Sequence, residues 1–224
     1  MRIPKLGRSG RNFVREVAIV LLGVLIALAL EQFASSLRDR ARTHAIQASM
    51  NEEIADFAEI FSLRQEVSGC ITAKLDALDD VLRRNGAVGP WRNVGRAPFY
   101  FSSRGSWNSD ASDLLSRHLG PERLRIYGEI YQGMEQVEAL QQQEQDHWIA
   151  LQTLERQDES LTGERRWRLI EAAAGARNAN LLLRAIADQM LANTQHLGVE
   201  RNRTLSTAEI RSRPICQPLA VNRA

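Results

Sequence analysis

One unbroken apolar run, Val17 to Leu30, constrains the chain more than any other feature of its sequence. A helix of fourteen residues covers roughly 21 Å, which is short of the ~30 Å hydrocarbon core of a bilayer. The run can be extended to residues 13–33, because Arg15 can reach the headgroups and the carboxylates of Glu16 and Glu31 would lie near the two interfaces. The extended segment is long enough to cross a membrane, and tilt can absorb the remaining mismatch.

We therefore predict a transmembrane signal-anchor helix over residues 13–34. Two other interpretations stay open. A cleaved secretory signal has a basic start, an apolar stretch of this length and small residues at its cleavage point, which Ala27-Leu28-Ala29 would supply. A buried helix of a soluble domain can also have this length. The anchor is favoured because the sequence after Leu30 continues as a helical pattern and does not resemble a processed start.

The charges around the apolar run predict its orientation, since Lys and Arg accumulate on the cytoplasmic side of a membrane. We expect a basic cytoplasmic tail over residues 1–12 and a periplasmic domain beyond the anchor, in a bacterial inner membrane crossed once. Five basic residues precede the run and three follow it: Arg2, Lys5, Arg8, Arg11 and Arg15, against Arg38, Arg40 and Arg42.

The pI of 8.8 suggests a basic protein, but the charge is unevenly placed. Residues 1–30 hold five basic residues and one acid, which leaves 24 basic and 26 acidic residues in the rest of the chain. Nucleic-acid binding requires a basic surface that neutralises phosphates, and the large domain has no basic excess. We therefore expect no nucleic-acid partner.

The chain contains two cysteines, Cys70 and Cys216. In an oxidising compartment, an even pair far apart in sequence suggests one disulfide, here between the first long helix and the C-terminal tail. Two unpaired thiols remain the alternative. The cysteines share no short spacing with each other or with histidine, so the sequence offers no zinc site.

Apolar residues at steps of three and four predict a helix from Glu31 to Arg84, continuous with the anchor. A stretch rich in Gly, Pro and aromatic residues follows at 86–106, and we expect a loop whose aromatic side chains cap one end of a helix bundle. The stripe of the first helix consists of Ile46, Met50, Ile54, Phe57 and Phe61, then Val67, Ile71, Leu75, Leu78 and Leu82.

Three further helices are predicted, at 106–118, 121–157 and 163–197, with Thr162 as N-cap and Gly198 as C-terminal cap of the last. We expect residues 35–198 to form the helical bundle and residues 199–224 a polar tail that is poorly ordered unless tied down, for example by the disulfide. The predicted class is all-α: an N-terminal transmembrane helix that continues into a long helix, packed in an antiparallel three- to four-helix bundle.

The helix over 121–157 carries a heptad seam, the packing signature of a bundle or coiled coil. The seam consists of Tyr127, Ile130, Met134, Val137, Gln141, Glu144, Trp148 and Leu151. Gln141 and Glu144 interrupt it, and with His147 and Trp148 they predict a polar layer that fixes register. A ligand pocket around these four residues is the alternative. Glu144 and His147 form half of a di-iron motif, but no second E-x-x-H pair exists, so we expect no metal site.

Catalytic signatures are missing from the sequence: it has no P-loop, no G-x-G-x-x-G, no H-E-x-x-H and no G-x-S-x-G. We therefore assign no catalytic residue, expect no cofactor and predict that the chain is not an enzyme.

The segment Arg15-Glu16-Val17 through Leu22-Gly23-Val24-Leu25-Ile26-Ala27-Leu28 resembles the start of a group of uncharacterised bacterial single-pass membrane proteins with a helical domain. The stretch from Ile215 to Leu219 and the segments around Trp107 and Trp148 are also similar to members of that group. The resemblance is specific over residues 13–33 and loose elsewhere. It implies a membrane protein of unknown function and supplies no catalytic residue.

These observations favour a membrane-anchored periplasmic protein that makes protein contacts in the cell envelope, either as a homo-oligomer through the seam or with another envelope protein. Its other partner would be the lipid bilayer. A small-ligand-sensing bundle that works with a partner is the first alternative, because helical bundles can bind small molecules between their helices. An enzyme of unrecognised type is the second.

Overall fold

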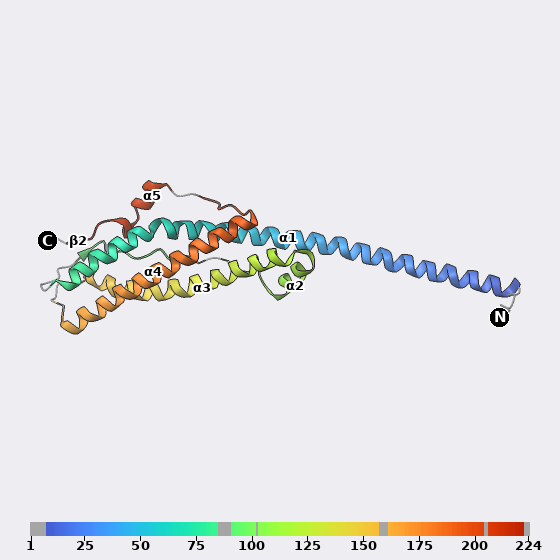
Figure 1. Ribbon diagram of the computed structural model, residues 1–224, viewed down its shortest axis with the longest axis horizontal. Coiled ribbons are helices and arrows are strands. Elements are labelled where there is room, and N and C mark those ends of the chain that lie inside the picture. The colour runs from blue at the N-terminus through green and yellow to red at the C-terminus, as the bar shows by residue number, and fades with distance from the viewer. Residues whose placement is uncertain (1–7, 85–90, 102, 157–160, 204–205, 222–224) are drawn as a thin grey trace.

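The computed structural model describes residues 8–84, 91–101, 103–156, 161–203 and 206–221. The molecule is 82% helical, and the only strands in those residues are two-residue pieces, so the predicted all-α class is confirmed. Figure 1 shows a long helical rod with a bundle of helices packed along one half of it.

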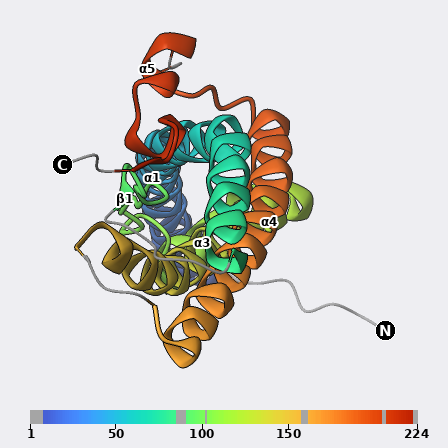
Figure 2. The same cartoon turned by 90° about the vertical axis from the view of Figure 1, so that its left-hand side faces the viewer.

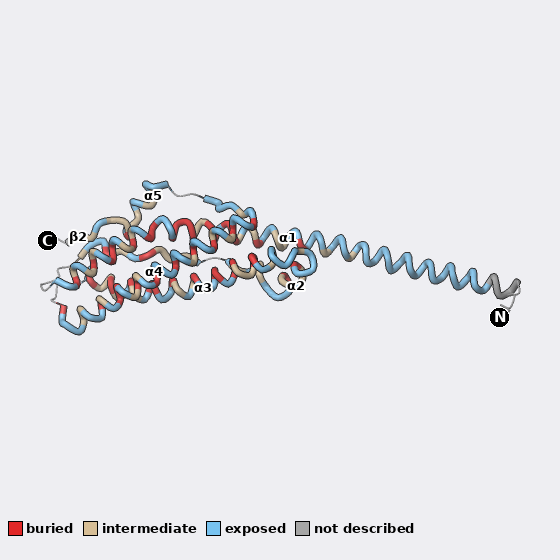
Figure 3. The backbone as a smooth tube through the Cα atoms, viewed as in Figure 1, coloured by how far each residue is buried: buried red, intermediate tan, exposed pale blue. Residues whose placement is uncertain are grey.

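The rod is a single helix, α1 (Arg8–Arg83), of 76 residues. The chain has no proline between Pro4 and Pro90, so nothing removes a backbone hydrogen bond along this length. An 18-residue window near its start has a mean hydropathy of 2.5 and none of it is buried (Figure 3), so this helix is long and apolar enough to cross a membrane. From Thr43 onward one face of the same helix is buried in the bundle.

Local signals set the ends of the other helices. The short helix α2 (Ser109–His118) begins later than predicted, because the side chain of Asn108 caps it by accepting from the Ala111 N–H at 2.9 Å. The helix α3 (Pro121–Gln152) starts at its proline and ends in a 3-10 turn, η1 (Thr153–Arg156). The predicted last residue of this helix, Gln157, lies outside the described residues.

The helix α4 (Gly163–Leu197) has both predicted caps: the Thr162 hydroxyl accepts from the Arg165 N–H, and Gly198 has a left-handed φ of 72°. The tail contains the short helix α5 (Thr207–Arg211) and a 3-10 turn, η2 (Pro214–Cys216).

Contacts between side chains give the directions of the three long helices. Along α1 and α3 the partners advance together, as in Asn51 with Tyr127 and Arg64 with Glu144, so these helices run parallel. Along α4 the partners run backwards, as in Asp76 with Arg177, so α4 is antiparallel to both. Figure 2 looks along the bundle and shows the three long helices packed side by side. The predicted antiparallel arrangement therefore describes α4 only.

The parallel pair requires a return path between the end of α1 and the start of α3. Residues 91–101 and 103–108 supply the described part of this path, and we call them the crossover. It begins with β1 (Trp91–Arg92) at the far end of the bundle and runs back along α1 and α3. The Glu155 carboxylate accepts from the Val94 N–H at 2.8 Å, and further along Glu53 accepts from the Ser106 N–H at 3.1 Å. Phe99, Tyr100 and Phe101 therefore line the side of the bundle, whereas Trp91 packs against the core at its end, as expected. Residues 86–90 and 102 of the predicted loop lie outside the described residues.

The tail, described over residues 199–203 and 206–221, runs along the bundle in the same direction as α1. Cys216 forms a disulfide with Cys70, and Ala220–Val221 (β2) pairs with Trp91–Arg92 in an antiparallel ladder. The buried Lys74 ammonium donates to the backbone carbonyls of Asn93 and Gln217, and its burial lowers the pKa of that amine. The crossover, the tail and α1 are thus joined at one place. These contacts hold the described part of the polar tail against the bundle.

The core consists of two apolar clusters along the bundle, one toward the disulfide and one toward the apolar start of α1. Every residue of the predicted heptad seam of α3 is buried within this core. The seam is therefore internal packing of a single chain, which removes it as the surface for a homo-oligomer.

We expect the double substitution M134A/V137A to lower the free energy of unfolding by at least about 2–5 kcal/mol, the range for a buried Met→Ala change. Both side chains are buried, so truncation leaves a cavity. Denaturant unfolding of the full chain measures the loss, with the exposed pair L181A/L182A as a matched control. A lower oligomer mass with unchanged stability would show that the seam is an interface after all.

Removing the disulfide with C70S/C216S should destabilise the domain by up to about 4–5 kcal/mol, because the bond closes a loop whose ends are 146 residues apart. Denaturant unfolding with and without reductant measures this. The chain has no other cysteines, so reduced wild type should match the variant. Equal stability of the oxidised and reduced wild type would contradict the expected tie.

Candidate functional site

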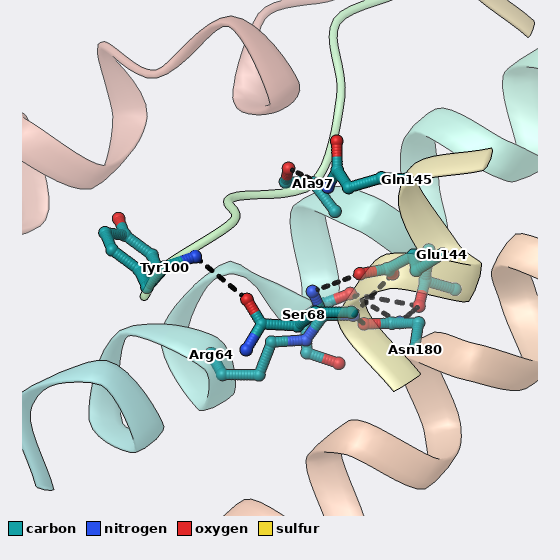
Figure 4. Close-up of polar contacts among 9 residues, drawn as sticks. Arg64, Ser68, Ala97, Tyr100, Glu144, Gln145 and Asn180 are labelled. Carbon is teal, nitrogen blue, oxygen red and sulfur yellow. Dashed lines mark hydrogen bonds and ion pairs between the residues drawn. The ribbon is translucent and has the colours of Figure 1, made fainter. Parts of the chain in front are cut away.

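A buried ion pair lies where the three long helices meet (Figure 4). The Arg64 guanidinium of α1 donates through Nη1 and Nη2 to the two carboxylate oxygens of Glu144 on α3, at 2.7 and 2.6 Å. Nη2 also donates to Oδ1 of Asn180 on α4 at 2.9 Å. The Asn180 amide nitrogen donates back to α1, at the Ser68 carbonyl and the Thr72 hydroxyl. Three side chains therefore set the register of all three helices.

Burial dominates the electrostatics of this cluster. The Glu144 side chain is 0% exposed and that of Arg64 is 7% exposed. Loss of solvent raises the pKa of Glu144, while the guanidinium opposes that rise by favouring the carboxylate. Removing both charges from water is costly. The two hydrogen bonds from the guanidinium to the two carboxylate oxygens offset much of that desolvation penalty.

The cluster has no room for a substrate. The adjoining cavity, lined by Arg64, Val137, Gln141 and Leu183 among others, has a volume of about 10 Å³. That is about the space of one water molecule. The arrangement can fix register, and the cavity beside it is too small to be the ligand pocket considered from the sequence.

The four residues of the predicted polar layer take different places. Gln141 accepts from the Tyr100 N–H at 3.0 Å, and Glu144 holds Arg64. Trp148 is fully buried, and its indole N–H has no partner among the described residues. His147 instead packs against α4, where a Cβ on Gly175 would come within 2.3 Å of the imidazole Nε2. Gln141, Glu144 and Trp148 are therefore all buried, His147 lies against α4, and the role of the four as a layer that fixes register stays a prediction.

Sequence reasoning missed Arg64 and Asn180. A signal for Arg64 exists, because it stands three residues after Phe61 and three before Val67, inside the apolar stripe of α1. A charged residue at such a position requires a buried partner of opposite charge. Asn180 carries no comparable signal, since amides are common on exposed helix faces.

A groove of about 570 Å³ opens between the crossover, α3 and the tail. Its floor includes Gln145, which is 5% exposed and donates through Nε2 to the Ala97 carbonyl at 3.0 Å (Figure 4). At its side, Nη1 of Arg213 donates to the Tyr100 hydroxyl at 3.0 Å. The remaining lining residues are Arg96, Pro98, Phe99, Phe101, Gln142, Ile149, Pro214 and Ile215.

A second groove of about 490 Å³ adjoins the first at Tyr100, Phe101 and Arg213. Its wall on α1 carries three carboxylates, those of Glu53, Asp56 and Glu59. The two grooves therefore differ in charge, and the Tyr100–Arg213 contact divides them.

The residues that the structure describes include no group of three or more His, Cys, Asp or Glu that could hold a metal ion. No family model, curated protein or solved structure matches the chain. The resemblance of its N-terminal segment to uncharacterised membrane proteins stays a prediction, and the function is argued from geometry.

Breaking the buried pair on one side should be costly: we expect E144L or R64M alone to lower the free energy of unfolding by about 3–5 kcal/mol. The double variant R64M/E144L should lose less than the sum of the single changes, because neither charge is left unpaired. Denaturant unfolding of the four proteins forms a double-mutant cycle. The exposed pair Asp76–Arg177 is the control and should couple by less than about 1 kcal/mol. Additive losses at Arg64 and Glu144 would contradict this role.

Proposed function

We propose that this chain is a single-pass protein of the bacterial inner membrane, with its N-terminus in the cytoplasm and its bundle in the periplasm, where it makes protein contacts. The observation that carries the proposal is the exposed first third of α1. Apolar side chains stand around this segment and remain uncovered by the rest of the chain; they include Phe13, Leu21, Leu25, Leu30 and Phe33. A helix that is apolar all round is either buried in protein or surrounded by lipid.

Two further observations support the periplasmic side. The Lys and Arg excess precedes the apolar run, as expected for a cytoplasmic N-terminus. The Cys70–Cys216 bond belongs to an oxidising compartment, which the periplasm is and the cytoplasm is not.

Continuity of α1 supports a contact role close to the bilayer. Residues 35–42, which separate the proposed anchor from the first buried residue of the bundle, Thr43, are helical and cover about 12 Å. The bundle is therefore held at a fixed short distance above the lipid. The cavity at the polar layer holds only about 10 Å³, so the surfaces of the bundle are where a partner can bind.

Small-ligand sensing is the second candidate, and the groove of about 570 Å³ favours it, since its volume lies in the range of small-molecule sites. The location differs from the one expected from the sequence: it lies at the crossover and tail, not between helices.

The test begins with the full chain carrying a C-terminal tag, expressed in bacteria and fractionated. We expect an intact protein in the inner membrane, oxidised on non-reducing gels, whose tag is digested by protease added to spheroplasts. A photocrosslinking residue placed at Phe101, Ile149 or Leu181 should then give discrete protein adducts at some of these exposed positions and not at others.

A soluble product that begins near Leu30 would overturn the anchor, and a tag protected in spheroplasts would overturn the orientation. An anchored protein that gives no discrete adduct from any exposed surface would contradict the contact role.

A further inference from the structure

The larger groove contains two buried polar atoms whose hydrogen-bonding capacity is unused. Nε2 of Gln145 is committed to the Ala97 carbonyl, so Oε1 remains as an acceptor, and it has no partner among the described residues. Nε of Arg213 is a donor in the same situation. Buried polar groups in native proteins are nearly always paired, so two unpaired ones on a single groove point to a bound group that satisfies them.

The charge of the residues that line the groove indicates the charge of the bound group. Its lining includes the guanidinium groups of Arg96 and Arg213 and no carboxylate. Arg96 is exposed and has no ion-pair partner among the described residues, so its charge is available to a ligand. The domain around this groove carries a slight acidic excess, so a local cluster of two arginines is a specific feature.

Apolar side chains at the rim add a second requirement. Phe101 is 75% exposed and Ile149 is 57% exposed, on opposite sides of the groove in the crossover and α3. Phe101 is held edge-on by Phe99, with ring centroids 4.7 Å apart. Fixed aromatic side chains in solvent are typical anchors for a partner's apolar residues.

We propose that this groove binds an extended peptide segment of a partner protein that combines acidic and apolar residues. Its backbone N–H groups would supply the donor that Oε1 of Gln145 requires, and its carboxylates would face Arg96 and Arg213. Its apolar side chains would cover Phe101 and Ile149. An extended chain fits because residues 96–101 of the crossover, which line the groove, make no backbone–backbone hydrogen bond within the described part of the chain. Their backbone is held by two side-chain contacts, at the Ala97 carbonyl and the Tyr100 N–H, and a strand with free backbone groups is a common template for peptide recognition. This inference rests on the proposed contact function and names its partner's chemistry.

The test uses the full chain in nanodiscs, probed with an array of random peptides of about a dozen residues. We expect the bound peptides to be enriched in Asp or Glu beside Leu, Ile, Phe or Trp. Fluorescence anisotropy then measures each selected peptide against a version with Asn and Gln in place of its acids. The acidic version should bind at least about tenfold more tightly, because the amide version loses its charge contacts.

Matched variants locate the site. R96E should weaken binding by about tenfold, while R184E, the same charge reversal on an exposed arginine of α4, should leave it unchanged. F101A should weaken binding and L181A, another exposed apolar residue, should not. Arg96 and Phe101 are both exposed. Thermal unfolding checks that every variant is folded, and non-reducing gels check that it is oxidised.

Equal enrichment of basic or neutral peptides, or binding that R96E leaves unchanged, would overturn the proposal. A small carboxylate such as succinate could also displace the peptides and stabilise the protein as strongly as they do. That result would overturn the proposal, because the groove would then be a small-molecule site. If the peptide-binding test fails while photocrosslinked adducts still form at Ile149 or Leu181, the acidic peptide is rejected as the partner and the proposed contact function still holds. Failure of both experiments rejects the contact function itself.

Discussion

The bidentate pair between Arg64 and Glu144 is the interaction on which the rest of the bundle depends. Apolar side chains can pack at several registers, but a buried guanidinium and a buried carboxylate tolerate only one. Residues of α3 within a turn of Glu144 then seat the crossover, since Gln141 accepts from Tyr100 and Gln145 donates to Ala97. The same layer that aligns the three helices thus places the segment that forms the groove.

A second constraint is that α1 is one continuous helix with two different surroundings, an exposed apolar part and a part packed in the bundle. Its first part exposes apolar side chains on all sides, and its later part buries one stripe against α3 and α4. No proline separates these parts, so the orientation of the bundle follows from that of the proposed anchor. The groove on the crossover and tail therefore has a fixed distance and direction relative to the apolar segment of α1.

Elements with strong local signals could be predicted from the sequence. The α3 seam is buried at every position named, Thr162 and Gly198 cap α4, and Cys70 lies opposite Cys216. The parallel path of α1 and α3 could not be predicted, because it depends on an irregular crossover that carries no periodicity. Asn180 was missed for a related reason: an amide on a helix has the same local pattern whether it faces water or Arg64.

The groove belongs to the same class of features that local sequence cannot reveal, because its walls come from three segments far apart in the chain. Arg96, Gln145 and Arg213 meet only because the crossover returns along α3 and the tail returns along α1. The tail keeps its place through the disulfide, the Lys74 hydrogen bonds and the β1–β2 ladder, all at its C-terminal end. Since the disulfide requires an oxidising compartment, one wall of the groove is completed only where the protein is proposed to work. Formation of the disulfide and completion of this wall of the groove are therefore physically coupled.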